Sequence, residues 1–260
     1  MHAGTSRSVL VSVIVILLAT VADAQFTTVI NSPPTEIAND EGVSSNTQVN
    51  ISANGVVGIS FGAGAADGTS ENVQVNISGG TVGDRFEAFR GSTVNISGGV
   101  VGPFFDANAG STVTISGGVI EHGFDAFAES LVNLSGGAVG DDFEAASGSA
   151  VNVSGGLIGD RFSTRSNSSV TLEGGEFRLD NEPVGELGPM DVPTGATLSG
   201  TFADGTPFAF SSDDGDALAS GSITLRSENL PAVGPALITA SNDPVPQGVR
   251  GGQELSLIHI

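Results

Sequence analysis

Four polar residues have side chains of the kinds that carry out acid–base chemistry: His122, Asp141, Asp142 and Arg161. They occupy two adjacent positions that recur every 19 residues, each time two or three residues after an apolar residue. Two carboxyl groups beside a base or a cation are what acid–base cleavage of a glycoside needs. The alternative interpretation is that all four are solvated turn residues, because Gly-Asp is favoured in turns for its backbone geometry.

A second recurring position is acidic in four consecutive repeats, at Glu87, Asp106, Asp125 and Glu144. If the repeats stack as strands, these four charges stand about 4.8 Å apart. Such a row is costly unless cations share it, and Ca²⁺ accepts several carboxylates in variable geometry, so Ca²⁺ is the candidate cofactor. The repeat lacks the nonapeptide signature of calcium-binding β-rolls. The alternative is a solvated anionic face that salt screens.

A third recurring position carries amides and hydroxyls. Stacked side chains of this kind are expected to hydrogen-bond along the stack as a ladder, and a regular face of them is also a candidate for binding carbohydrate or ice. The position is occupied by Asn50, Asn76, Asn95, Thr114, Asn133, Asn152 and Thr171. We find no zinc-ligand spacing, phosphate-binding loop or nucleophile motif in the sequence.

These positions belong to a 19-residue repeat whose first regular copy reads VNISGGTVGDRFEAFRGST from Val75. A fixed period of this length is typical of a solenoid, in which each copy forms one coil. Within a copy the apolar residues alternate as in strands, so Val75 and Ile77 are expected to point inward. Turns are predicted at Gly79-Gly80, at Gly83-Asp84 and at Gly91-Ser92, which gives three short strands and three turns in each coil. The second glycine of the copies lies at Gly80, Gly99, Gly118, Gly137, Gly156 and Gly175.

Stacking of the coils predicts four internal ladders of like residues. The aromatic ladder comprises Phe61, Phe86, Phe105, Phe124, Phe143 and Phe162. Two aliphatic ladders comprise Val82, Val101, Ile120, Val139 and Ile158, and Ile77, Ile96, Ile115, Leu134 and Val153. The small-residue ladder comprises Ala63, Ala88, Ala107, Ala126 and Ala145. Burial of each larger side chain stabilises the fold by about 1.5–3 kcal/mol.

The chain divides into five segments. Residues 1–24 have the pattern of a secretory signal peptide, with an apolar run shorter than the roughly 20 residues of a membrane span; the alternative is an uncleaved anchor. Residues 25–48 are expected to form an extended lead-in, and residues 49–175 are expected to form the parallel β-helix. Residues 176–230 predict a β cap with a hairpin at Asp204-Gly205. Residues 231–260 read as a linker, with 256–260 resembling a sequencing artefact, and we expect the chain to be a fragment of a longer protein.

Composition restricts the partners. The formal net charge is −21, from 29 acidic residues against 8 Lys plus Arg, so nucleic acid is an unfavourable partner. There is no cysteine to form disulfides. With the signal peptide, these features predict a secreted chain, extracellular or on the cell surface, that is not an integral membrane protein once the signal is cleaved.

The region from about 49 to 240 resembles secreted bacterial right-handed parallel β-helix proteins of the pectin-lyase-like superfold, through the repeat VxISGGxVGDxFxAxxGSx. The resemblance implies an all-β fold, and it covers adhesins as well as polysaccharide-cleaving enzymes. We expect a non-enzymatic structural or adhesin-like module, with Ca²⁺, extracellular polysaccharide or cell-surface components as candidate partners. The alternative is a polysaccharide lyase or glycoside hydrolase of the same superfold.

Overall fold

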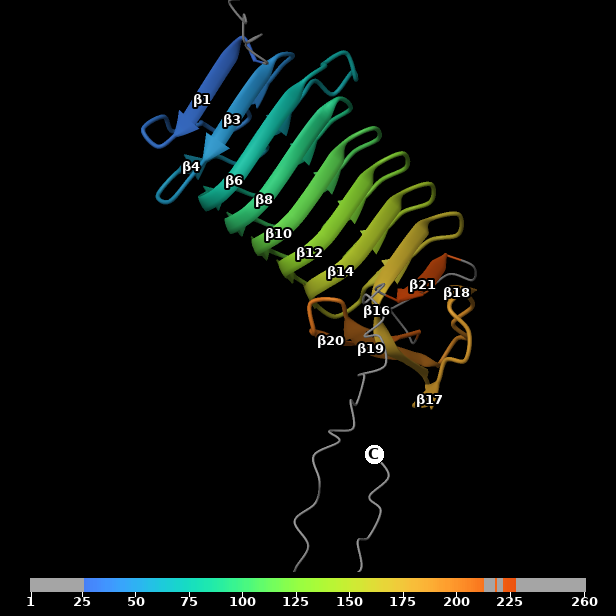
Figure 1. Cartoon of the computed structure of the whole chain (residues 1–260). Coiled ribbons are helices and arrows are strands. Elements are labelled where there is room, and N and C mark those ends of the chain that lie inside the picture. The colour runs from blue at the N-terminus through green and yellow to red at the C-terminus, as the bar shows by residue number, and fades with distance from the viewer. Residues whose placement is uncertain (1–25, 213–217, 219–221, 228–260) are drawn as a thin grey trace, which may run out of the picture. The chain divides into compact units, whose positions relative to one another are not determined.

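The computed structural model describes residues 26–212, 218 and 222–227, and every regular element in this part of the chain is a β-strand (Figure 1). The predicted all-β class and the stacking of 19-residue coils as a parallel β-solenoid are confirmed. The described residues hold no helix that could cross a membrane. The predicted signal peptide (1–24) and linker (231–260) lie outside the described residues.

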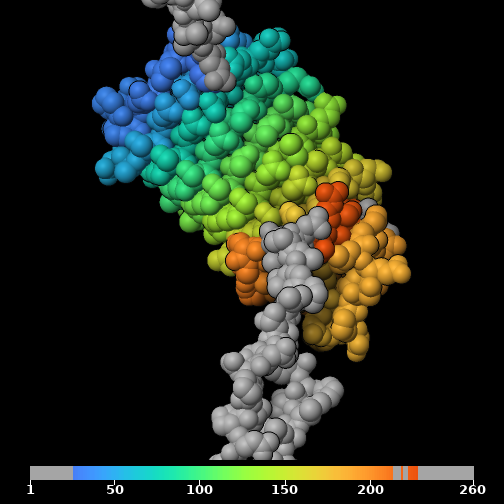
Figure 2. All heavy atoms as spheres, viewed as in Figure 1, coloured from blue at the N-terminus to red at the C-terminus, as the bar shows by residue number. Residues whose placement is uncertain are grey.

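One long sheet runs the length of the solenoid, and each of its strands pairs in parallel with the strand one coil further on (Figure 1). Its strands are β1 (Thr28–Ser32), β3 (Thr47–Ile51), β6 (Val73–Val82), β8 (Ser92–Val101), β10 (Thr112–Ile120), β12 (Leu131–Val139), β14 (Ala150–Ile158) and β16 (Ser169–Leu179). The short β4 (Val56–Val57) pairs with β6 beside β3. In the space-filling view the coils follow one another as bands of successive colour (Figure 2).

A second sheet of two-residue strands closes the other side of each coil. It comprises β2 (Gly42–Val43), β5 (Gly62–Ala63), β7 (Glu87–Ala88), β9 (Asp106–Ala107), β11 (Asp125–Ala126), β13 (Glu144–Ala145) and β15 (Ser163–Thr164). Each short strand places one residue outward and its alanine or equivalent inward, because successive strand residues face opposite sides. The coils that begin with β6, β8, β10, β12 and β14 therefore each have one long and one short strand, whereas the coil before them has β3 and β4 as separate strands.

The turn predicted at Gly79-Gly80 and at the equivalent glycine pairs is wrong, because the strand continues through it. The chain does leave its strands near the other two predicted turns, between β6 and β7 and between β7 and β8. In β6 the pairing with β8 shifts between Ile77 and Thr81, which marks a β-bulge. Gly80 lies in the left-handed region, with φ +73°. A glycine in this conformation lets a strand take up an extra residue without ending. In the coils that begin with β6 to β14, two of the three predicted strands are therefore one bent strand.

The predicted core ladders are present. The six phenylalanines from Phe61 to Phe162 are buried, and successive ring centroids are 5.6, 4.7, 4.8, 4.9 and 5.1 Å apart. All five alanines of the small-residue ladder are fully buried. Both aliphatic ladders are buried too, apart from Ile158, which is partly exposed at the end of β14. Because the same side chain recurs on each rung, one packing arrangement serves every coil.

The solenoid begins earlier than the sequence indicated. Strand β1 pairs with β3 in register from Thr28 to Ser32, and Ile37 is 6% exposed. Ile30 and Val43 pack against the same core. These apolar residues give the segment predicted as an extended lead-in (25–48) enough inward side chains to form a coil of its own.

A β cap covers the last coil. Strand β16 leaves the repeat register and pairs in antiparallel fashion with β19 (Thr197–Phe202), which forms the predicted hairpin with β20 (Pro207–Ser211) around Asp204-Gly205. Strand β21 (Ile223–Ser227) adds a parallel rung beside β16, and β18 (Gly188–Met190) pairs with β21. The short β17 (Glu182–Pro183) pairs with β16. The ring of Phe210 lies 4.9 Å from that of Phe162, so the aromatic ladder continues into the cap.

Candidate functional site

Charge is segregated between the two sheets. Strands β3, β6, β8, β10, β12 and β14 contain no charged residue, although the chain carries a net charge of −21. The outward side chains of these six strands, here called the neutral face, are amides, hydroxyls and aliphatic groups. The acidic residues of the coils lie instead in the short sheet and in the turns beside it.

An amide ladder runs along the neutral face, as predicted. The Nδ2 atoms of Asn50, Asn76 and Asn95 each donate to the Oδ1 atom of the preceding asparagine at 2.9 Å, beginning with Asn31. Asn152 donates to Asn133 in the same way at 2.9 Å. The bonds fix the amide orientations, because each side chain donates in one direction and accepts from the other.

An aliphatic column lies beside the amide ladder, beyond the glycine bulge. Its members are in register on consecutive strands: Val56, Thr81, Val100, Val119, Ala138 and Leu157. Val119 is 44% exposed and Leu157 59% exposed. The neutral face therefore offers hydrogen-bonding groups and an apolar strip side by side, at the rung spacing of about 4.8 Å.

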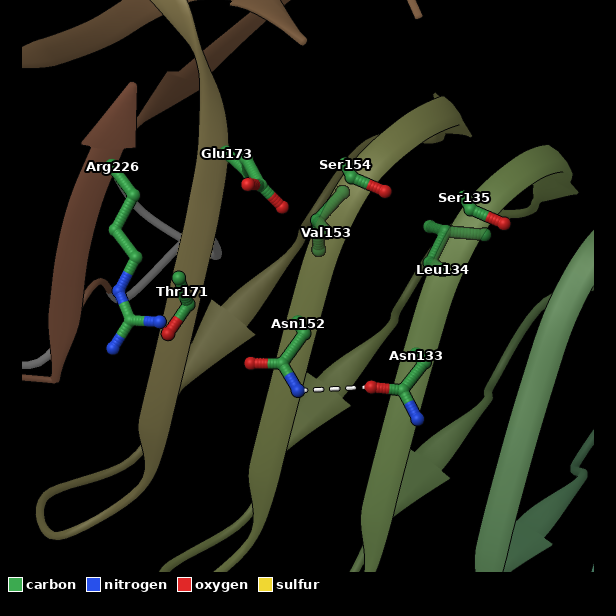
Figure 3. A pocket seen from close by; sticks show the side chains of 9 residues that line it. All are labelled: Asn133, Leu134, Ser135, Asn152, Val153, Ser154, Thr171, Glu173 and Arg226. Atoms are coloured by element: carbon green, nitrogen blue, oxygen red, sulfur yellow. Dashed lines mark hydrogen bonds between the residues drawn. The ribbon is translucent and has the colours of Figure 1, made fainter. Parts of the chain in front are cut away.

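A depression of about 320 Å³ lies where the neutral face reaches the cap (Figure 3). The hydrogen-bonded pair Asn133 and Asn152 lines one side, with Thr171 next along the row. Glu173 and Arg226, on the paired strands β16 and β21, occupy the same rung position and line the far end. Donors and acceptors thus converge where the run of uncharged strands ends.

The structure brings together three of the four residues proposed for acid–base chemistry. His122, Asp142 and Arg161 line a second depression, of about 350 Å³, beside the short sheet. Arg161 donates through Nε and Nη2 to the two carboxylate oxygens of Asp142, and this hydrogen bonding lowers the pKa of Asp142. Asp141 does not line the depression; its Oδ1 accepts the backbone N–H of Asp160 at 3.0 Å.

The repeat position that Asp142 and Arg161 share shapes the backbone of each turn. Arg85, Phe104, Gly123, Asp142 and Arg161 all lie in the left-handed region, with φ between 57° and 76°. The backbone N–H groups of the first four donate to carbonyl oxygens of the next coil at 2.8–2.9 Å. This geometry and the Arg161 ion pair favour the turn interpretation of Asp141 and Asp142 over a role in proton transfer.

The acidic column lies in register on the short sheet, where Asp106 pairs with Glu87 and Asp125, and Asp125 pairs with Glu144. Burial raises the pKa of Asp106 and Asp125 to about 6, reinforced by the neighbouring carboxylates and, for Asp125, opposed by Arg165. Arg165 donates to Glu144 Oε2 at 2.6 Å. In the described part of the chain no group of three or more His, Asp or Glu residues is placed to hold a metal ion. The calcium site stays a prediction.

The raised pKa values make the fold more stable at low pH. A carboxyl group with a raised pKa binds more protons in the folded chain, so its contribution is full below its ordinary pKa of 3.8 and is lost as the pH rises through about 6. We expect Asp106→Asn with Asp125→Asn to raise the midpoint of thermal unfolding more at about pH 7.5 than at about pH 4.5. Circular dichroism at both pH values measures this, and an equal gain at both would contradict it.

Sequence reasoning missed Glu173 and Arg226, because they are register partners on strands whose pairing does not follow the 19-residue period. The aliphatic column was also missed, although its residues recur at the same repeat position and could have been found by the same alignment. Compared with models of protein families, with curated proteins and with solved structures, the chain matches none of them.

Proposed function

We propose that this chain is a non-enzymatic structural or adhesin-like module of the extracellular space or cell surface, which binds a neutral polysaccharide through its neutral face. One observation carries the proposal: six consecutive long strands present no charge in a chain of net charge −21. The remaining surface is anionic, and it repels acidic polymers.

The chemistry of the neutral face matches that of a neutral sugar chain. Sugar hydroxyl groups both donate and accept hydrogen bonds, as do the amides of Asn76 and Asn95 and the hydroxyls of Thr93 and Thr112. The C–H faces of sugar rings are apolar, and Val119 and Leu157 offer exposed apolar area beside the amides. Burying uncharged groups also avoids the large desolvation penalty of burying a charge.

A pair of arginines on the neutral face tests the proposal. We expect Val119→Arg with Leu157→Arg to weaken binding to soluble glucans, xylans and mannans at least tenfold, because two bulky charges would have to be desolvated beneath the polymer. Affinity gel electrophoresis measures the binding of the wild type and the variant to each polymer.

The control is Ala209→Arg, which adds one arginine at an exposed strand position of the cap. We expect it to retain wild-type binding. Equal loss in both variants, or no binding by the wild type, would contradict the assignment to the neutral face. Release of reducing sugar from any of the polymers would contradict the non-enzymatic role.

A further inference from the structure

The one long insertion among the matched coils forms a depression of its own. Asn50 and Asn76 are 26 residues apart, whereas Asn76 and Asn95 are 19 apart, and the difference falls largely in the loop from Gly64 to Ser70. In solenoids, loops inserted into a repeat often mark a binding surface. This loop is ordered by its own hydrogen bonds, from Ala65 N to Ser70 Oγ and from Thr69 to Asp67 Oδ1.

The loop lies against the coil that follows it. A Cβ atom added to Gly64 would be 3.3 Å from Phe89 Cβ, and one added to Gly68 would be 3.6 Å from Arg90 Cδ. Between the loop and this coil lies a depression of about 300 Å³, lined by residues 65–68, Phe89, Arg90 and Asn108. It lies apart from the neutral face, and none of its lining residues belongs to the long strands.

Asn108 in this depression has an unmet hydrogen-bonding requirement. Its Nδ2 atom is buried and has no partner, and it is the one such side-chain atom in the part of the chain that the structure describes. Phe89 and Phe127 hold the equivalent position in the preceding and following coils, so the side chains stacked on Asn108 are aromatic rings that offer no hydrogen-bond acceptor. A buried donor left without an acceptor is costly, and such a group calls for a specific explanation.

We propose that this depression binds one neutral sugar residue, with Asn108 as its hydrogen-bond donor and Phe89 as its apolar wall. The terminal torsion of an asparagine amide is broad, so a small rotation brings Nδ2 to a ligand oxygen. Arg90 donates through Nη2 to Glu129 Oε2, and Asp67 accepts from Thr69 through Oδ1. The remaining N–H groups of the guanidinium and the Oδ2 atom of Asp67 can therefore bond to the hydroxyl groups of a ligand. Opposite charges at the rim and an aromatic wall suit an uncharged polyhydroxyl ligand better than an ion.

Nuclear magnetic resonance on the full ¹⁵N-labelled chain tests the site directly. The side-chain NH₂ signals of Asn108 are assigned by their absence from Asn108→Leu, and the probes are glucose, galactose, mannose, N-acetylglucosamine and their short oligomers. We expect at least one probe to shift the Asn108 signals saturably. Asn108→Leu should weaken that binding at least tenfold, whereas Val119→Arg with Leu157→Arg should leave it unchanged. The two sugar sites are thereby distinguished.

A stability measurement on the same variants adds a second readout. Asn108→Leu removes an unpaired buried donor, so we expect its thermal midpoint to rise by about 2–4 °C. The matched change Asn95→Leu removes an amide that is bonded in the ladder, and it should lower the midpoint. Asn108 signals that stay unchanged with every probe, or undiminished binding by Asn108→Leu, would overturn the proposal whatever the neutral face binds.

Discussion

Replacing Phe105 with alanine is expected to lower the free energy of unfolding by about 3–5 kcal/mol, the range for deleting a buried aromatic ring. The ring of Phe105 is fully buried, and its centroid lies 4.7 Å from that of Phe86 and 4.8 Å from that of Phe124. The cavity cannot close easily, because the rungs above and below are held at the strand spacing by the backbone. Urea denaturation followed by circular dichroism measures the loss.

The neighbouring residue supplies the control. Phe104 is 50% exposed in the turn, where its ring and that of His122 form a T-shaped pair with centroids 5.2 Å apart. We expect Phe104→Ala to change the free energy of unfolding by about 0.5 kcal/mol or less. If both variants lost the same stability, the aromatic ladder would not be the source of the effect.

Replacing Gly118 with alanine is expected to cost about 2–5 kcal/mol, although the change adds a single methyl group. Gly118 has φ +81°, where an L-residue is strained. An added Cβ would also lie 2.9 Å from the carbonyl carbon and oxygen of Gly98 on the adjacent rung. The backbone of Gly98 cannot rotate away from the added methyl group as a flexible side chain could. The strain would therefore disturb the pairing of β10 with β8. Urea denaturation again gives the magnitude.

Gly175 occupies the same repeat position and provides a matched comparison. At Gly175 no atom lies within 4 Å of an added Cβ, and its φ is outside the left-handed region. We expect Gly175→Ala to be neutral or slightly stabilising, because alanine restricts the unfolded chain. A loss at Gly175 as large as that at Gly118 would show that stacking on the adjacent rung is not the cause.

The solenoid and its ladders could be predicted because a fixed period translates directly into vertical stacking. Once Phe86 and Phe105 are 19 residues apart in identical contexts, one rung determines the surroundings of the next. The same reasoning placed Asn76 under Asn95 and Asp106 under Asp125. Residue types and spacing were sufficient there, because no other part of the chain intervenes.

Prediction failed where the geometry depends on more than the period. Pairing with both neighbouring rungs decides whether Gly79-Gly80 ends a strand or bends it. The sequence of a single copy does not contain this information. The pairing of Arg90 with Glu129 spans 39 residues and skips a coil, so it depends on side-chain reach. Glu173 and Arg226 become register partners only because β21 of the cap pairs with β16. Three of the four candidate acid–base residues lie together, but their arginine is committed to an ion pair with Asp142.

The aromatic ladder continues from Phe162 into Phe210 of the cap. The number of coils can therefore change without removing the ring on which the cap stacks. The cap stacks Phe210 on the phenylalanine of the last coil, and every regular coil presents a phenylalanine ring in the same place. An in-frame gain or loss of 57 nucleotides, which encode one 19-residue copy, would return an equivalent ring to the cap. Gain or loss of whole copies can therefore lengthen or shorten the solenoid in steps of one coil while the stacking of rings against the cap is kept.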